Sequence, residues 1–334
     1  MFAYLKSIRL LSKSLFLRSS MVVILLFSLS PIGLQAEIIS VNGDDGKTLT
    51  LKKPAKRVIA LGPNLVESLF EIGAGDYLIG VSEYSDYPEQ AKLIRRVGSH
   101  NTVNYEMIVS MAPDLVLIWH SGFGRDVVDK LRALGLKVFV SEPQTLQDVD
   151  VLLQKLGKLT GLNQQAQMAS ASYRSELKRL QSTYSTKTVV PVFYQVWHEP
   201  MQSLNGNHVV SAVIELCGGR NVFAQAKEIA PRVSIESVIA MNPQVIIASG
   251  SDGKRPSWLD DWLRWPMIDA VKQQQLYFVK PDVLVRHAPR ILQGADQVCR
   301  LLEQARLGSR VSVDVSDSFG GTGSTIESAT LGNK

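Results

Sequence analysis

The sequence lacks the motifs of the common enzyme classes. Its 334 residues contain no G-x-S-x-G nucleophile elbow, no P-loop, no H-E-x-x-H metal motif and no G-x-G-x-x-G after a predicted strand. The five histidines are scattered and do not have metal-site spacing, although a site assembled from His100 and His120 remains an alternative. These absences favour a binding protein, so we expect no catalytic residue, no resident cofactor and no metal.

The chain also has little net charge once its first segment is set aside. Residues 1–36 hold four basic and no acidic residues, which leaves 32 basic residues against 31 acidic ones. A net charge of +1 argues against nucleic acid as a partner, because nucleic acid requires a basic face.

That first segment is typical of a secretory signal peptide. A basic start precedes the uncharged apolar run Met21–Leu29, and a small residue, Ala36, follows. The run is shorter than the roughly 20 residues that span a membrane. No cysteine follows it that could carry a lipid anchor. We therefore expect export, with cleavage near Ala36.

Cysteine is scarce, with only Cys217 and Cys299 present. An exported chain meets an oxidising compartment, which favours a disulfide over two free thiols. Two buried free thiols are the alternative.

One pattern occurs twice in the chain. The stretches Tyr105–Trp119 (YEMIVSMAPDLVLIW) and Ile235–Ser249 (IESVIAMNPQVIIAS) match along their length. Each follows a polar capping residue, forms about two helical turns and meets a proline that ends the helix. Each then continues as an aliphatic run that predicts a strand buried on both faces. Glu106 and Glu236 occupy the same place in the two helices.

A second pair of segments supports a duplication. Asn64–Gly75 and His208–Gly219 both predict apolar helices that end at glycines. In the first, we expect Asn64 to cap the helix, with Glu67 in capping-box spacing. Helices that alternate with strands indicate parallel sheets covered on both faces. We therefore predict two related α/β lobes, with a ligand site between them.

The helix predicted over Gln164–Tyr184 lies between the two halves. It lacks proline and glycine, and Met168, Ala171, Tyr173 and Leu177 mostly recur at helical spacing. It is either a rod that joins the lobes or another lobe helix. The predicted organisation is a signal peptide (1–36), an N-terminal lobe (37–160), a connecting helix (161–186), a C-terminal lobe (187–307) and a disordered tail (308–334).

Over Pro54–Leu302 the chain resembles a known family. The most specific stretches are RVIALGPNLVESLFEIGAG, SEYSDYPEQAK, LCGGRNVFA, RVSIE and RHAPRIL. They are similar to the periplasmic solute-binding proteins of the helical-backbone class (class III), which serve ABC importers, and within it to the vitamin B12 (cobalamin) binding proteins. The resemblance implies two Rossmann-like lobes with central parallel sheets joined by one long α-helix. It also implies a periplasmic monomer in which Cys217 bridges Cys299.

The resemblance gives the repeated glutamates a function. It implies that Glu106 and Glu236 dock onto arginines of the membrane permease, which works with an ATPase. The alternative is that each glutamate only stabilises its own helix, because the helix dipole alone favours a glutamate in the first turn.

The resemblance also implies a set of ligand contacts. The residues expected to bind cobalamin or a related corrinoid are Tyr84, His100, Trp119, Val196, Trp197, Asp282 and Arg286. Three positions at which the family places aromatic residues are His100, Val196 and Ala230 here. The same fold binding a ferric siderophore or haem is therefore an alternative, and an exported metal-dependent enzyme or a sensor is an alternative of another class.

Overall fold

The computed structural model describes residues 38–250 and 253–308. The predicted signal peptide lies outside the described residues, as does the predicted tail apart from Gly308. Within the described ranges, no helix is long and apolar enough to cross a membrane.

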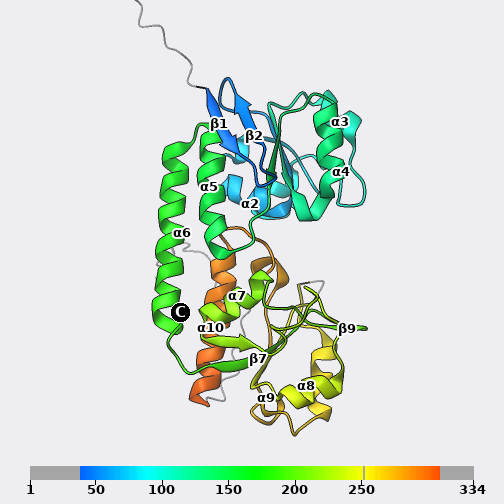
Figure 1. Cartoon of the computed structure of the whole chain (residues 1–334), viewed down its shortest axis with the longest axis vertical. Coiled ribbons are helices and arrows are strands. Elements are labelled where there is room, and N and C mark those ends of the chain that lie inside the picture. Colours follow the sequence, from blue (N-terminus) through cyan, green and yellow to red (C-terminus); the bar gives the residue numbers. More distant parts are fainter. Residues whose placement is uncertain (1–37, 251–252, 309–334) are drawn as a thin grey trace, which may run out of the picture. The chain divides into compact units, whose positions relative to one another are not determined.

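The N-terminal lobe is built on a four-stranded parallel sheet (Figure 1). Its strands are β3 (Val58–Leu61), β4 (Leu78–Val81), β5 (Leu115–Trp119) and β6 (Val138–Ser141), in the order β4-β3-β5-β6. Its helices are α2 (Pro63–Glu71), α3 (Tyr105–Ser110), α4 (His120–Ala133) and α5 (Leu146–Thr160), with short 3₁₀ turns η1 (Gly75–Tyr77) and η2 (Glu89–Leu93). An antiparallel hairpin, β1 (Ile39–Asn42) and β2 (Thr48–Leu51), precedes them. The aliphatic run at the end of Tyr105–Trp119, predicted as a buried strand, is β5, which is buried almost throughout.

The C-terminal lobe repeats this arrangement. Its parallel strands are β7 (Val190–Gln195), β10 (Gly219–Asn221), β11 (Val245–Ala248) and β12 (Leu276–Phe278), in the order β10-β7-β11-β12. In both sheets the first strand along the chain pairs with the second on one side and the third on the other. The helices are α7 (Val209–Leu216), α8 (Ile235–Met241), α9 (Asp269–Lys272) and α10 (Ile291–Leu307), with the hairpin β8 (Trp197–His198) and β9 (Met201–Gln202) and 3₁₀ turns η3 (Ser257–Arg264) and η4 (Pro281–Val283). The shared strand order supports the duplication that the repeats predicted.

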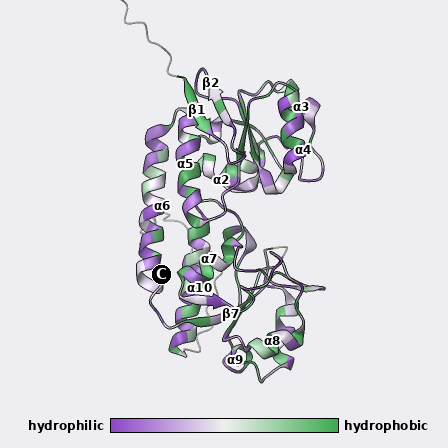
Figure 2. Ribbon diagram, viewed as in Figure 1, coloured by the Kyte–Doolittle hydropathy of each residue, from purple (hydrophilic) through white to green (hydrophobic). Residues whose placement is uncertain are grey.

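The lobes are joined by α6 (Asn163–Tyr184), whose 22 residues extend about 33 Å. Figure 2 shows hydrophilic residues along much of α6, and one face is buried. Tyr173 and Leu177 lie on that face as predicted. Met168, predicted to share it, is 60% exposed, because Ala166 and Ser170 take up the buried positions of the same turns.

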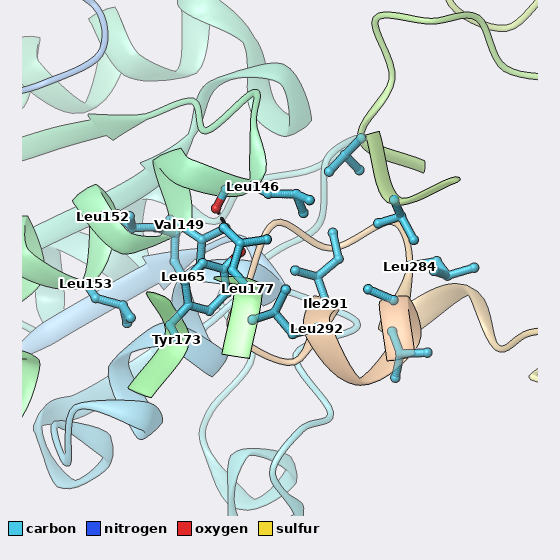
Figure 3. Close-up of a cluster of buried hydrophobic side chains, with 14 of the residues drawn as sticks. Leu65, Leu146, Val149, Leu152, Leu153, Tyr173, Leu177, Leu284, Ile291 and Leu292 are labelled. Carbon is cyan, nitrogen blue, oxygen red and sulfur yellow. Dashed lines mark hydrogen bonds between the residues drawn. The ribbon is translucent and has the colours of Figure 1, made fainter. Parts of the chain in front are cut away.

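A continuous apolar core connects α6 to both lobes. Figure 3 shows Leu65 of α2 and Leu146 of α5 together with Leu177 of α6 and Ile291 and Leu292 of α10. The Tyr173 hydroxyl donates to the Leu146 carbonyl at 2.7 Å. Close-packed interiors resist deformation, so we expect the two lobes to close by only a small movement when a solute binds.

Two local predictions were wrong. The N-cap of α2 is Gly62, and the Asn64 side chain lies inside the helix without a hydrogen-bond partner. The Glu67 side chain does not return to the helix start but bonds to residues of the other lobe, so no capping box forms. The segment after β5 is helical from His120 onward, with a non-helical break only at Gly124.

The predicted disulfide between Cys217 and Cys299 is present. Cys217 follows α7, Cys299 lies within α10, and both are fully buried. The bond therefore fixes two helices of the C-terminal lobe to each other.

Candidate functional site

Each sheet carries a tryptophan at the carboxyl end of one of its two central strands. In each sheet the strand order reverses between the first and third strands, and ligands of open α/β sheets bind beyond the carboxyl ends of strands at such a point. Trp119 is the last residue of β5, and Trp197 comes two residues after β7. Both are therefore at the positions where a parallel sheet most often presents a ligand site.

Trp119 is held between two glycines. A Cβ on Gly62 would lie 2.9 Å from Trp119 Cβ, and a Cβ on Gly122 would lie 2.4 Å from Cε3 of its ring. The indole nitrogen is buried and has no hydrogen-bond partner among the described residues. The Trp119 ring is thus fixed against the start of α4, and its indole N–H makes no hydrogen bond among the described residues.

Replacing Gly122 with alanine should displace the Trp119 ring. Because the new Cβ would meet the indole far inside van der Waals contact, we expect a loss of about 1–3 kcal/mol in the free energy of unfolding. Urea unfolding measures the loss in the free energy of unfolding, and near-ultraviolet circular dichroism reports the displacement of the Trp119 ring. In a Trp119→Ala background the same Gly122→Ala change should cost almost nothing. An equal cost in both backgrounds would disprove the contact.

Trp197 belongs to an aromatic cluster on the β8–β9 hairpin. Its ring centroid lies 5.5 Å from that of His198, which stacks on Trp258 at 5.5 Å with 14° between the planes. The Trp197 indole donates to the Glu199 carbonyl at 3.0 Å, and the residue is 38% exposed. The cluster offers a broad aromatic surface beyond the carboxyl end of β7.

Tyr84, Asp282 and Arg286 are brought together between the lobes. Tyr84 follows β4, and its side chain is 71% exposed. Its carbonyl accepts a hydrogen bond at 3.2 Å from Arg286, which follows β12. Asp282 accepts from Arg290 at 2.9 Å. The segments that follow β4 and β12 therefore meet between the lobes.

Sequence reasoning missed Glu67, Asp86 and Arg290 in this group. Arg286 Nη1 donates at 2.8 Å to both Glu67 and Asp86, and Arg290 donates to Glu67 at 2.9 and 3.1 Å. Burial disfavours the charged arginines, but the hydrogen bonds with the carboxylates outweigh it, and the pKa of both is raised. Burial opposes ionisation of Asp86 as well, yet Arg286 holds its pKa below the usual range.

Two predicted ligand residues, His100 and Val196, are not bonded to this group, nor is Ala230, where the family places an aromatic residue. His100 is exposed on the loop before α3, and Ala230 is exposed before α8. Val196 packs against the apolar core, and its amide donates to the Gln202 carbonyl at 2.9 Å. None of these three residues forms a hydrogen bond or an ion pair with Tyr84, Asp282 or Arg286 in the described part of the chain.

The two repeated glutamates are exposed in the first turns of α3 and α8. Asn104 and Ser234 cap the two helices as predicted, with bonds of 2.9 and 3.2 Å to backbone amides. Hydrogen bonds from the backbone amide of Glu236 and from the Ser234 hydroxyl lower the pKa of Glu236. Neither glutamate forms an ion pair within the described residues, so both charges are available to a partner.

A cavity of about 610 Å³ lies elsewhere, between α6 and α10, lined by residues such as Ser172, Leu292 and Gln293. None of the predicted ligand residues lines this cavity. In residues 38–250 and 253–308 no group of three or more His, Cys, Asp or Glu side chains could hold a metal ion.

Comparison with known proteins identifies relatives over most of the chain. A family model described as periplasmic binding protein matches residues 58–283. The vitamin B12-binding protein of Vibrio cholerae is 35% identical over 257 residues, which are 76% of this chain and 91% of that protein. The crystal structure of the periplasmic vitamin B12 binding protein of Vibrio cholerae superposes with a TM-score of 0.69, over 76% of this chain and 98% of that one. A periplasmic heme-binding protein from Roseiflexus sp. superposes with a TM-score of 0.67 at 22% identity, over 75% of this chain and 99% of that one, a likeness that shows the fold alone.

Proposed function

Because the chain belongs to the periplasmic binding protein family, we propose that it is the solute-binding subunit of an ABC importer and that its solute is cobalamin. The observation that carries this proposal is the likeness to the vitamin B12-binding protein of Vibrio cholerae along nearly the whole of that protein. The protein acts by binding and delivery, and not by catalysis.

The side chains between the lobes suit a corrin. A corrin ring is broad and apolar on its faces, with amide groups around its edge. Aromatic surfaces with a few polar groups bind such molecules well. Tyr84 and Trp197 expose aromatic surface, Trp119 is a partly exposed aromatic residue at the end of β5, and the Arg286 guanidinium is a donor for an amide oxygen. We assign these four residues to the solute site.

Delivery requires the periplasm and a membrane partner. Residues 1–36 would direct export and be removed near Ala36. Glu106 and Glu236 would then dock onto basic residues of the permease, one from each lobe. Exposed charge pairs of this kind chiefly steer and orient a partner, so the spacing of the two glutamates would set how the protein sits on the permease.

Titration with cyanocobalamin tests the solute. We expect a saturable quenching of tryptophan fluorescence in the exported, purified protein, with a dissociation constant of about 1 µM or lower. A Trp119→Phe variant should bind more weakly, because phenylalanine offers a smaller aromatic surface than tryptophan. Free tryptophan at the same absorbance corrects for light absorbed by the corrin.

Hemin and a ferric siderophore, titrated in parallel, provide the comparison. The proposal predicts that cyanocobalamin binds more tightly than either. Absence of saturable quenching by cyanocobalamin, or tighter binding of hemin, would refute the assignment of the solute while leaving the family intact.

A further inference from the structure

A buried carboxylate links the two lobes. Glu67 of α2 accepts hydrogen bonds from both Arg286 and Arg290 of the C-terminal lobe, at 2.8 to 3.1 Å. The Glu67 side chain is 3% exposed, and those of Arg286 and Arg290 are 16% and 11% exposed. Charges buried to this degree require partners. Glu67 is the only acceptor that the two arginines share among the described residues.

The same arginines hold the loop that follows β4. Arg286 donates to the Tyr84 carbonyl and, at 2.8 Å, to the Asp86 carboxylate. The Arg290 guanidinium lies 3.8 Å from the centre of the Tyr87 ring, a cation–π contact. Three residues of the loop 82–88 are therefore fixed from the other lobe.

Tyr84 depends on this hold. Its φ of 62° is in the left-handed region, where residues other than glycine are strained and stay only if their surroundings hold them. Tyr84 is 71% exposed, so packing of its ring does not keep the backbone in this conformation. Within the N-terminal lobe, hydrogen bonds hold its neighbours Glu83 and Ser85. From the other lobe, Arg286 donates to the Tyr84 carbonyl and to Asp86 two residues later.

We propose that Glu67 is a positioning residue for the solute site. By anchoring Arg286 and Arg290 together, it presents Tyr84 and Tyr87 between the lobes before any solute binds. Glu67 itself need not touch the solute. The inference rests on the proposed function only in taking the Tyr84 surface as part of the solute site.

The test uses fluorine NMR on the solute-free protein. The chain contains nine tyrosines, and 3-fluorotyrosine labels all of them. Tyr84→Phe and Tyr87→Phe variants assign the two loop signals. Tyr173 and Tyr194 are buried in the core, so their signals report on general damage to the fold.

Glu67→Gln removes the charge and keeps the shape. We expect the Tyr84 and Tyr87 signals to shift toward those of an unfolded peptide, while the Tyr173 and Tyr194 signals keep their wild-type positions. Glu67→Asp, which restores the charge, should recover part of the change. The matched control is Glu71→Gln, one turn later on α2, because Glu71 bonds to neither arginine in the described part of the chain.

Two results would overturn the proposal. Unchanged loop signals in Glu67→Gln would show that Glu67 does not position the loop. Equal shifts of all four signals would show that Glu67 only supports the fold as a whole.

A second measurement connects the loop to the solute. Glu67→Gln should weaken cyanocobalamin binding about tenfold, because a loosened loop populates the binding arrangement less often, whereas Glu71→Gln should not. If the NMR result holds and affinity is unchanged, the positioning role for the solute is refuted. If the wild-type protein does not bind cyanocobalamin at all, the proposed solute fails, and the NMR result still decides whether Glu67 positions the loop.

Discussion

Reversing both repeated charges, with Glu106→Lys and Glu236→Lys in one protein, should abolish cobalamin uptake. The two glutamates are exposed at equivalent places in the two lobes, and neither has an ionic partner in the described chain. Against a basic permease surface, each reversal replaces an attraction with a like-charge contact, which costs several kcal/mol. We expect a loss of uptake of about tenfold for one reversal and more than 100-fold for both.

Uptake is measured with radiolabelled cyanocobalamin in cells that carry the importer and lack their own binding protein. Solute affinity of the double variant should equal that of the wild type, since neither glutamate belongs to the solute site. The control is Asp126→Lys with Glu215→Lys, which places the same change of charge on exposed residues of both lobes. Normal uptake by the Glu106/Glu236 variant would reject the docking assignment.

Removing the disulfide should cause the largest loss of stability. The bond between Cys217 and Cys299 closes a loop of 82 residues, for which the chain-entropy model gives about 4.5 kcal/mol. Replacing both cysteines with alanine, which avoids leaving polar hydroxyls in a buried site, should lower the free energy of unfolding by that amount. The comparison is made by guanidinium unfolding of the oxidised wild type and the double variant.

Reduction provides an independent check of the same bond. Wild-type protein unfolded with a reducing agent present should reach the midpoint of the double variant, and the variant should not respond to the reducing agent. A difference below about 1 kcal/mol between oxidised wild type and variant would mean that the bond contributes little.

The repeated strands were predictable for a physical reason. In parallel sheets covered on both faces the strands are continuous aliphatic runs, so Leu115–Trp119 and Val245–Ala248 are visible in sequence as matching segments. Because matching segments follow one another in the same order in both halves of the chain, the two sheets have the same strand order. The cap of α2 was less predictable, because Gly62 takes the N-cap position and Asn64, a residue that commonly caps helices, is buried within the helix.

The proposed solute site was only partly predictable. Tyr84, Asp282 and Arg286 were identified by resemblance, and the structure brings them to one place. Glu67 was missed because its partner Arg286 is 219 residues away, which local spacing cannot reveal. A usable signal did exist: Glu67 is an acid that lies between the apolar residues Val66 and Leu69 of a predicted helix, where a buried charge requires a partner.

The most direct test of cobalamin binding between the lobes is a crystal structure of the protein grown with cyanocobalamin. We predict that the corrin lies at the carboxyl edges of both sheets, against Trp119 and Trp197, with Arg286 still bonded to Glu67. A corrin in the cavity between α6 and α10, or crystals without corrin at saturating concentration, would contradict this prediction.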